Sequence, residues 1–83
     1  MIKILYFASL RERIGIADEE IELPTGTTIQ GVMEILKSRN DIWFDTFSSN
    51  TKVLTAVNQE MASIDAPIKD GDELAFFPPV TGG

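Results

Sequence analysis

The stretch ELAFFPPVTGG, residues 73–83, combines an alternating apolar run with two prolines and two glycines. The run at 73–77 predicts a strand, with Leu74 and Phe76 toward the core and Phe77 on the opposite face. Proline has no N–H to donate to a sheet ladder, so the first proline should end this strand. The rest of the chain is then expected to build a sheet around it.

The residues after this strand, 78–83, are expected to protrude as a tail. Pro78 and Pro79 favour an extended backbone that leads away from the domain. Gly82 and Gly83 have no side chains, so this end can enter a channel too narrow for any other residue. The segment therefore resembles a flexible stalk that carries a carboxylate, although a frayed terminus is the simpler alternative.

Composition limits the chemistry that the chain can perform alone. Its 83 residues are enough for one small domain, residues 1–83, and they include no cysteine and no histidine. Thiolate nucleophiles, imidazole acid–base catalysis and Cys/His zinc sites are thereby excluded. No metal site and no stably bound cofactor are predicted, and the chain is not expected to be an enzyme on its own. A reacting terminal carboxylate needs none of the missing groups if partner proteins supply them.

The charge of the chain narrows the choice of partners. A net charge of −6 argues against nucleic acid, because phosphate contacts need clustered Lys and Arg. It favours a protein partner with a basic surface, or serves solubility alone. No long apolar run and no signal-like leader is present, so no membrane association and a cytoplasmic location are expected.

Patterns along the chain predict the other elements. Residues 1–8 read as a strand, and its core face is expected to hold Ile2, Ile4, Tyr6 and Ala8. Residues 9–16 read as one helical turn that Ser9 caps and Gly15 ends. Residues 18–23 alternate like a half-exposed strand that pairs with the first as a hairpin.

The clearest helix follows a turn at 24–26. Thr27 and Gln30 have capping-box spacing, and apolar residues recur at helical spacing until the helix ends near Asn40. The aromatic segment 41–49 predicts a short helical turn over one end of the core. Strands are expected at 52–58 and 61–64, with turns at 58–60 and 67–72.

This order predicts an α+β fold of two layers, in which one main helix packs on one face of a mixed five-stranded sheet. Three stretches then resemble a known family: LYFASLRE at 5–12, AVNQ at 56–59 and DGDELAFFPPVTGG at 70–83. They are similar to the small, sulfur-carrying subunits of molybdopterin synthase, which have the ubiquitin-like β-grasp fold. Thr81 stands where many members of that family have serine.

The resemblance implies a function for the tail. In that family an adenylating enzyme that resembles ubiquitin activators uses ATP to activate the terminal carboxylate, here that of Gly83. A sulfur donor then displaces AMP and leaves a thiocarboxylate. The large synthase subunit accepts the tail, and the sulfur passes to cyclic pyranopterin monophosphate to form the molybdopterin dithiolene. The family's synthase is a heterotetramer with two large subunits.

The same resemblance assigns residues to contacts with partners. The residues expected to thread into the large subunit are Pro78, Pro79, Val80, Thr81 and Gly82. Phe7 and Phe77 would form an outward aromatic patch if the first and last strands pair, or be covered by local side chains. Arg11 lies in a family-like stretch and would bind a partner or remain a solvated charge. Asp70, Asp72 and Glu73 either steer docking or simply form a good turn.

Three other functions remain open from the sequence alone. A sulfur carrier for thiamine thiazole formation or tRNA thiolation would have the same Gly-Gly end. A ubiquitin-like modifier would use the same acyl-adenylate to form isopeptides. A pure interaction domain would have an inert tail.

Overall fold

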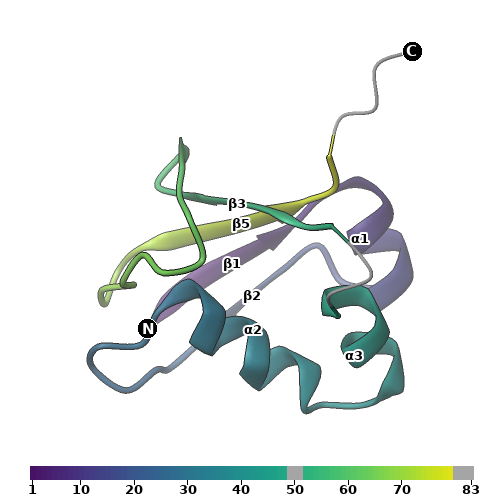
Figure 1. Cartoon of the computed structure of the whole chain (residues 1–83), viewed down its shortest axis with the longest axis horizontal. Coiled ribbons are helices and arrows are strands. Elements are labelled where there is room, and N and C mark those ends of the chain that lie inside the picture. The colour runs from purple at the N-terminus through teal and green to yellow at the C-terminus, as the bar shows by residue number, and fades with distance from the viewer. Residues whose placement is uncertain (49–51, 80–83) are drawn as a thin grey trace.

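Five strands form one mixed sheet in a computed structural model of the chain, which describes residues 1–48 and 52–79 (Figure 1). The elements in chain order are β1 (Ile2–Tyr6), α1 (Ala8–Ile14), β2 (Asp18–Ile21), α2 (Ile29–Lys37), α3 (Asp41–Phe47), β3 (Leu54–Val57), β4 (Glu60–Met61) and β5 (Glu73–Phe77). The sheet order is β2-β1-β5-β3-β4. β1 and β5 run parallel and the other neighbours antiparallel, so the predicted mixed sheet and first hairpin are confirmed.

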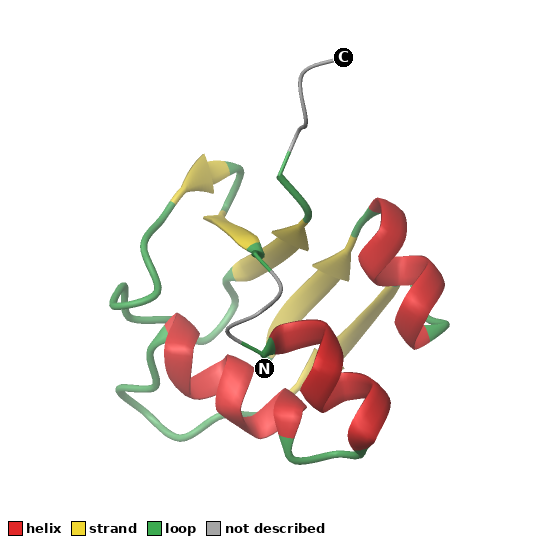
Figure 2. Cartoon of the chain, turned by 45° about the vertical axis from the view of Figure 1, so that its right-hand side comes forward, coloured by secondary structure: helices red, strands yellow, loops and turns green. Residues whose placement is uncertain are grey.

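The core lies between the helices and one face of the sheet (Figure 2). Its buried residues are Ile2, Ile4, Tyr6, Leu10, Ile29, Val32, Leu36, Trp43, Phe47, Ile68, Leu74 and Phe76. Four aromatic rings meet at its centre. The Phe76 centroid lies 5.0 Å from that of Phe47 and 6.1 Å from that of Tyr6, and the Trp43 centroid lies 5.5 Å from that of Tyr6. The opposite face of the sheet, called the open face below, carries none of the helices formed by the described residues (Figures 1 and 2).

The start of α1 differs from the prediction. Ile2, Ile4 and Tyr6 are buried as expected, but Ala8 is exposed and begins the helix. Ser9 lies inside α1, whose N-cap residue is Phe7 with no side-chain capping bond. β1 therefore ends two residues earlier than the apolar pattern suggested. The predicted end of the helix at Gly15 is confirmed, because Gly15 has the left-handed φ of 85° that favours glycine.

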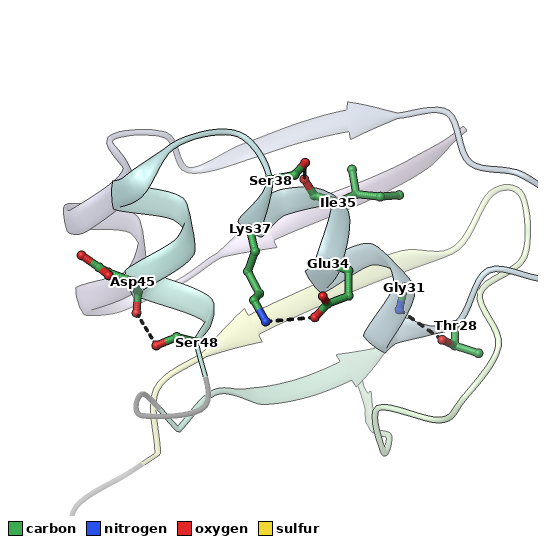
Figure 3. A network of polar contacts seen from close by, with 8 residues as sticks. All are labelled: Thr28, Gly31, Glu34, Ile35, Lys37, Ser38, Asp45 and Ser48. Atoms are coloured by element: carbon green, nitrogen blue, oxygen red, sulfur yellow. Dashed lines mark hydrogen bonds and ion pairs between the residues drawn. The ribbon is translucent and has the colours of Figure 1, made fainter.

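α2 begins one residue later than predicted. The Thr28 side-chain oxygen accepts a hydrogen bond from the Gly31 N–H at 3.1 Å, and Thr28 is the N-cap (Figure 3). The Thr27 hydroxyl instead donates to a carbonyl of the preceding turn at 2.7 Å. α2 also ends earlier than Asn40, at Lys37, where an ion pair with Glu34 closes the last turn.

Asn40 does not end α2, because it caps the next helix. Its side-chain oxygen accepts a hydrogen bond from the Trp43 N–H at 3.1 Å, and α3 follows. Trp43 and Phe47 are buried, so the aromatic segment covers the core as predicted. The layer opposite the sheet thus contains two helices of seven residues beside the nine-residue α2.

The predicted strand at 61–64 is almost absent, since β4 contains only Glu60–Met61. Backbone carbonyls beyond β4 instead accept hydrogen bonds from the first turn of α2. The Gln30 N–H donates to the Ile64 carbonyl at 2.8 Å, and the Ile29 N–H donates to the Ala66 carbonyl at 3.0 Å. These carbonyls satisfy helix N–H groups that have no partner within the helix. The pairing with β3 continues to Ala62, whose N–H donates to the Thr55 carbonyl at 3.1 Å.

A polar network ties the edge strand β2 to the turn before α3. Both Glu19 carboxylate oxygens accept hydrogen bonds from the Arg39 guanidinium at 2.8 Å, and Tyr6 donates its hydroxyl to Glu19 at 2.7 Å. The guanidinium also lies 4.5 Å from the centre of the Trp43 ring. Burial raises the pKa of Tyr6, so its hydroxyl stays protonated as a donor. Hydrogen bonds from Arg39 lower the pKa of Glu19 below its ordinary value of 4.5.

Replacing Glu19 with Gln should lower the free energy of unfolding by about 1–2 kcal/mol at neutral pH, because it removes a two-point charged hydrogen bond. The folded-state pKa of Glu19 lies below its unfolded value. Its contribution is therefore fully present above about pH 4.5 and lost as the pH falls through the folded pKa. Urea unfolding of both proteins at several pH values should show the difference shrink in acid. The exposed neighbour Glu20 is the control, and an equal loss in Glu20→Gln would contradict the prediction.

Candidate partner-binding surface

The last strand ends where the prolines begin. β5 stops at Phe77, and the half-buried Pro78 and Pro79 follow outside the sheet, as their missing N–H groups require. The predicted threading residues Val80, Thr81 and Gly82, the reacting Gly83 and the flexibility of the tail lie outside the described residues. What the structure describes is the surface from which this segment leaves.

The two predicted surface aromatics share the open face of the sheet. Tyr6 and Phe76 are register partners and both are buried, so the residues after them alternate to the other side. The Phe7 N–H donates to the Phe76 carbonyl at 3.1 Å, which extends the parallel pairing by one residue. Phe7 has extended backbone angles and is 44% exposed, while Phe77 is half-buried. The predicted placement of Phe7 and Phe77 on one face is thus confirmed.

Strand β3 adds an apolar residue that the sequence analysis did not assign to this surface. Leu54 is the register partner of Phe77 in the antiparallel pair of β3 and β5, and it therefore faces the same side. Phe7, Leu54 and Phe77 together are called the tail-root surface here. The sequence predicted a strand at 52–58 without assigning faces to its residues, and only the register places Leu54 beside Phe77.

A second apolar row continues the tail-root surface across the open face. Register partners in this row are Leu5, Ala75, Ala56 and Met61, which come from four neighbouring strands. Met61 is 64% exposed at the end of the row. Leu5 and Ala75 are half-buried and Ala56 is only 7% exposed, so the strongly exposed residue of this row is Met61. Apolar area left exposed on a small domain is typical of a surface that binds another protein.

Arg11 lies on α1, which packs against β5. Its side chain is exposed, and its backbone carbonyl accepts a hydrogen bond from Gly15 at 2.8 Å. A partner contact by Arg11 stays a prediction.

The acidic residues near the tail in sequence are far from it in the fold. Asp72 and Glu73 stand at the start of β5, a whole strand away from Pro78 (Figure 1). Asp72 accepts hydrogen bonds from the Lys69 N–H at 2.8 Å and from the Asn58 amide at 3.1 Å, and these bonds lower its pKa. These contacts support the interpretation that the acidic residues form a turn, rather than the interpretation that they steer docking.

Hydrogen bonds of Asn58 link two of the family-like stretches, AVNQ at 56–59 and the start of the stretch at 70–83. Its side-chain oxygen accepts a hydrogen bond from the Glu73 N–H at 3.0 Å, and its N–H donates to the Glu73 carbonyl at 2.8 Å. The AVNQ and DGDE segments thus join the β3–β4 turn to the start of β5. Their role in the described residues is to hold the central strand in register.

Other features lie away from the tail-root surface. A pocket of about 540 Å³ at the opposite end of the sheet is lined by Met1, Ile2, Glu22, Leu23, Pro24, Thr25, Gly26, Pro67, Ile68, Lys69 and Asp70. Over residues 1–48 and 52–79, no cluster of three or more acidic side chains is placed to hold a metal ion. No helix in the same residues is long and apolar enough to cross a membrane.

The described residues thus form a small β-grasp domain that presents an apolar face beside the exit of its C-terminal segment. This is the arrangement of the ubiquitin-like carriers and modifiers. The ThiS family model matches residues 4–83, and the chain belongs to the ThiS family.

Individual relatives agree with this assignment. The chain is 42% identical to the molybdopterin synthase sulfur carrier subunit of Escherichia coli, and the match covers all of both chains. A Pyrococcus furiosus structure assigned as molybdopterin converting factor, subunit 1, is 36% identical with a TM-score of 0.80, over 95% of this chain and 97% of that one. The resemblance drawn from the three sequence stretches is confirmed.

A more distant structure shows the same fold. It is a complex of subunits 1 and 2 of molybdopterin-converting factor from Helicobacter pylori, matched over 99% of this chain and 97% of that one. The identity is 20% and the TM-score 0.67.

Proposed function

We propose that this chain is the sulfur-carrier subunit of a molybdopterin synthase and that its reacting group is the carboxylate of Gly83. The observation that carries the proposal is the end-to-end identity of 42% with a relative of that function. The absence of Cys and His supports it, since the sulfur would be held on the terminal carbonyl carbon. The chain itself would not catalyse the reaction.

The chemistry requires activation because a carboxylate is a poor electrophile. A Gly83 oxygen attacks the α-phosphorus of ATP in the adenylating partner, and pyrophosphate leaves. Sulfur from a donor then attacks the carbonyl carbon, and AMP leaves, which gives the thiocarboxylate. In the large subunit this sulfur passes to cyclic pyranopterin monophosphate, and the carrier returns as a carboxylate. Two charged carriers are needed for each dithiolene.

The open face would supply the docking energy for these encounters. Phe7 and Phe77 are the aromatic anchors of the tail-root surface, and exposed aromatics of this kind often dominate binding energy. Arg11 would contact the partner at the margin. The tail residues Pro78 to Gly82 then place Gly83 in the partner's active site. We further propose a cytoplasmic heterotetramer with two large subunits.

Intact mass measurement tests the proposed reaction. The purified chain is incubated with its adenylating enzyme, ATP and a sulfur donor, and fragmentation locates any change. The expected result is the exchange of one oxygen for sulfur at Gly83. AMP formation without a thiocarboxylate would overturn the proposal and favour a protein modifier. Adding the large subunit and cyclic pyranopterin monophosphate should then produce the dithiolene; a charged carrier that gives none belongs to another pathway.

The Phe77→Ala variant should bind the large subunit about 10- to 100-fold more weakly, because it removes an anchor of the apolar surface. Its melting temperature should change little, since Phe77 is only half-buried. Phe44→Ala is the matched control, because Phe44 is 53% exposed on α3 rather than on the sheet. Calorimetric titration measures both affinities, and equal affinities for Phe77→Ala and the unmodified chain would exclude this surface.

A further inference from the structure

One residue beside the tail-root surface has a costly backbone conformation. Ala8 has a φ of 53°, in the left-handed region that L-residues with a Cβ avoid. Asn58 and Gln59 also have positive φ, but they form the tight turn between β3 and β4, where this conformation is usual. Ala8 lies between a strand and a helix, and holding alanine in this region costs about 1–2 kcal/mol.

Packing of the Ala8 side chain does not account for this conformation. Ala8 is exposed, so its methyl group fills no space in the core. The backbone hydrogen bonds of the preceding residue, Phe7, show which contacts accompany this conformation. The Phe7 N–H donates to the Phe76 carbonyl at 3.1 Å, and the Phe7 carbonyl accepts from the Leu10 N–H at 3.2 Å. Phe7 is thus held both as the last residue of the sheet ladder and as the cap of α1.

The conformation of Ala8 lets the side chains of Phe7 and Leu10, three residues apart, point to opposite sides of the sheet. Phe7 keeps extended angles and faces outward, while Leu10, three residues later, is only 2% exposed in the core. A strand that turned into the helix without a left-handed residue would change the direction of Phe7 or of Leu10. The position of the Phe7 ring on the open face therefore depends on the backbone of Ala8.

We propose that Ala8 is a positioning residue for partner docking: its left-handed backbone holds the Phe7 ring on the tail-root surface beside Leu54 and Phe77. The inference rests on the proposed function, because it explains how the Phe7 ring is positioned for docking to the large synthase subunit. A small residue is required at this position. Glycine adopts the conformation without strain, whereas a β-branched residue opposes it strongly.

A double-mutant cycle tests the proposal with the full chain and the large synthase subunit. Ala8→Val should weaken binding about tenfold, while Ala8→Gly should stay within about twofold of the unmodified chain. In a Phe7→Ala background, Ala8→Val should cause no further loss, because Ala8 acts through Phe7. Ser9→Val is the control, since it places the same side chain on the next residue, inside α1.

Two further measurements make each outcome decisive. Thermal melting and the nuclear Overhauser contacts of the Phe7 ring report whether Ala8→Val is folded and whether the ring has moved. An unchanged affinity for Ala8→Val, or an equal loss with and without Phe7, overturns the positioning role. If Ala8→Val does not fold, the Ala8→Gly variant decides: a loss of more than about tenfold in a folded protein overturns it. An unmodified chain that acquires sulfur but shows an additive cycle refutes only this inference. A chain that neither acquires sulfur nor binds the large subunit refutes the proposed function as well.

Discussion

Deletion of Gly83 is expected to abolish sulfur loading and sulfur transfer while the melting temperature of the domain stays unchanged. The reacting carboxylate would move to Gly82, which shortens the tail by about 3.3–3.6 Å and withdraws the carbonyl carbon from the activating site. A displacement of even about 1 Å can cost a hundredfold in rate. Mass spectrometry of the chain after incubation with ATP, activator and sulfur donor measures the loading.

Docking provides the internal control for this deletion. The shortened chain keeps Phe7, Leu54 and Phe77, so it should still compete with the unmodified chain for the large subunit. Loss of chemistry with retained competition would separate the reacting end from the binding surface. A deletion variant that still acquires sulfur would contradict the assignment of Gly83 as the reacting residue. A variant that keeps both sulfur loading and sulfur transfer would favour an inert tail.

Replacement of Phe76 with Ala is expected to remove most of the stability of the domain. The Phe76 side chain is fully buried between the Tyr6 and Phe47 rings, so its loss leaves a large cavity. Such substitutions cost about 3–5 kcal/mol, against a total stability of about 5–15 kcal/mol for a typical domain. A domain of this size lies near the lower end of that range. Urea unfolding followed by circular dichroism measures the loss.

The neighbouring residue supplies the contrast. Phe77→Ala removes the same ring from the open face, so it should reduce binding far more than stability. Phe76→Leu should cost less stability than Phe76→Ala because it leaves a smaller cavity. Equal urea midpoints for Phe76→Ala and the unmodified chain would contradict the placement of this ring in the core.

The division between Phe76 and Phe77 could be predicted from the sequence because its causes are local. Strand alternation separates their two side chains, and Pro78 ends the strand directly after them. The main helix was likewise visible from the helical spacing of its apolar residues, and the aromatic content of the segment after it predicted a helical turn over the core. The three family-like stretches gave the family itself.

Features that depend on distant residues could not be predicted in the same way. Leu54 joins the tail-root surface only through the register of β3 with β5. The predicted strand at 61–64 is shortened, and the Ile64 carbonyl at its end instead accepts a hydrogen bond from α2, more than thirty residues earlier in the chain. Glu19 pairs with Arg39 across 20 positions, and no local pattern announces that pair.

The left-handed conformation of Ala8 was also not predictable, because local preference opposes it. The apolar alternation of residues 1–8 favoured a longer strand, with Ala8 facing the core. The hydrogen bonds of Phe7 to β5 and to α1 impose the turn instead. Departures of this kind, where tertiary contacts override local preference, are expected near functional surfaces.

The order of the sheet has a consequence for synthesis of the protein. Among the strands of residues 1–48 and 52–79, β5 comes latest in the chain, yet it lies between β1 and β3 and joins the two halves of the sheet. A nascent chain that stops before residue 77 lacks this joining strand and the buried Leu74 and Phe76, so it cannot complete the core. Folding is thereby coupled to translation of the segment that leads directly into the tail. Under the proposed function, abortive chains would present neither the docking face nor Gly83 to the activating enzyme, so no ATP would be consumed on them.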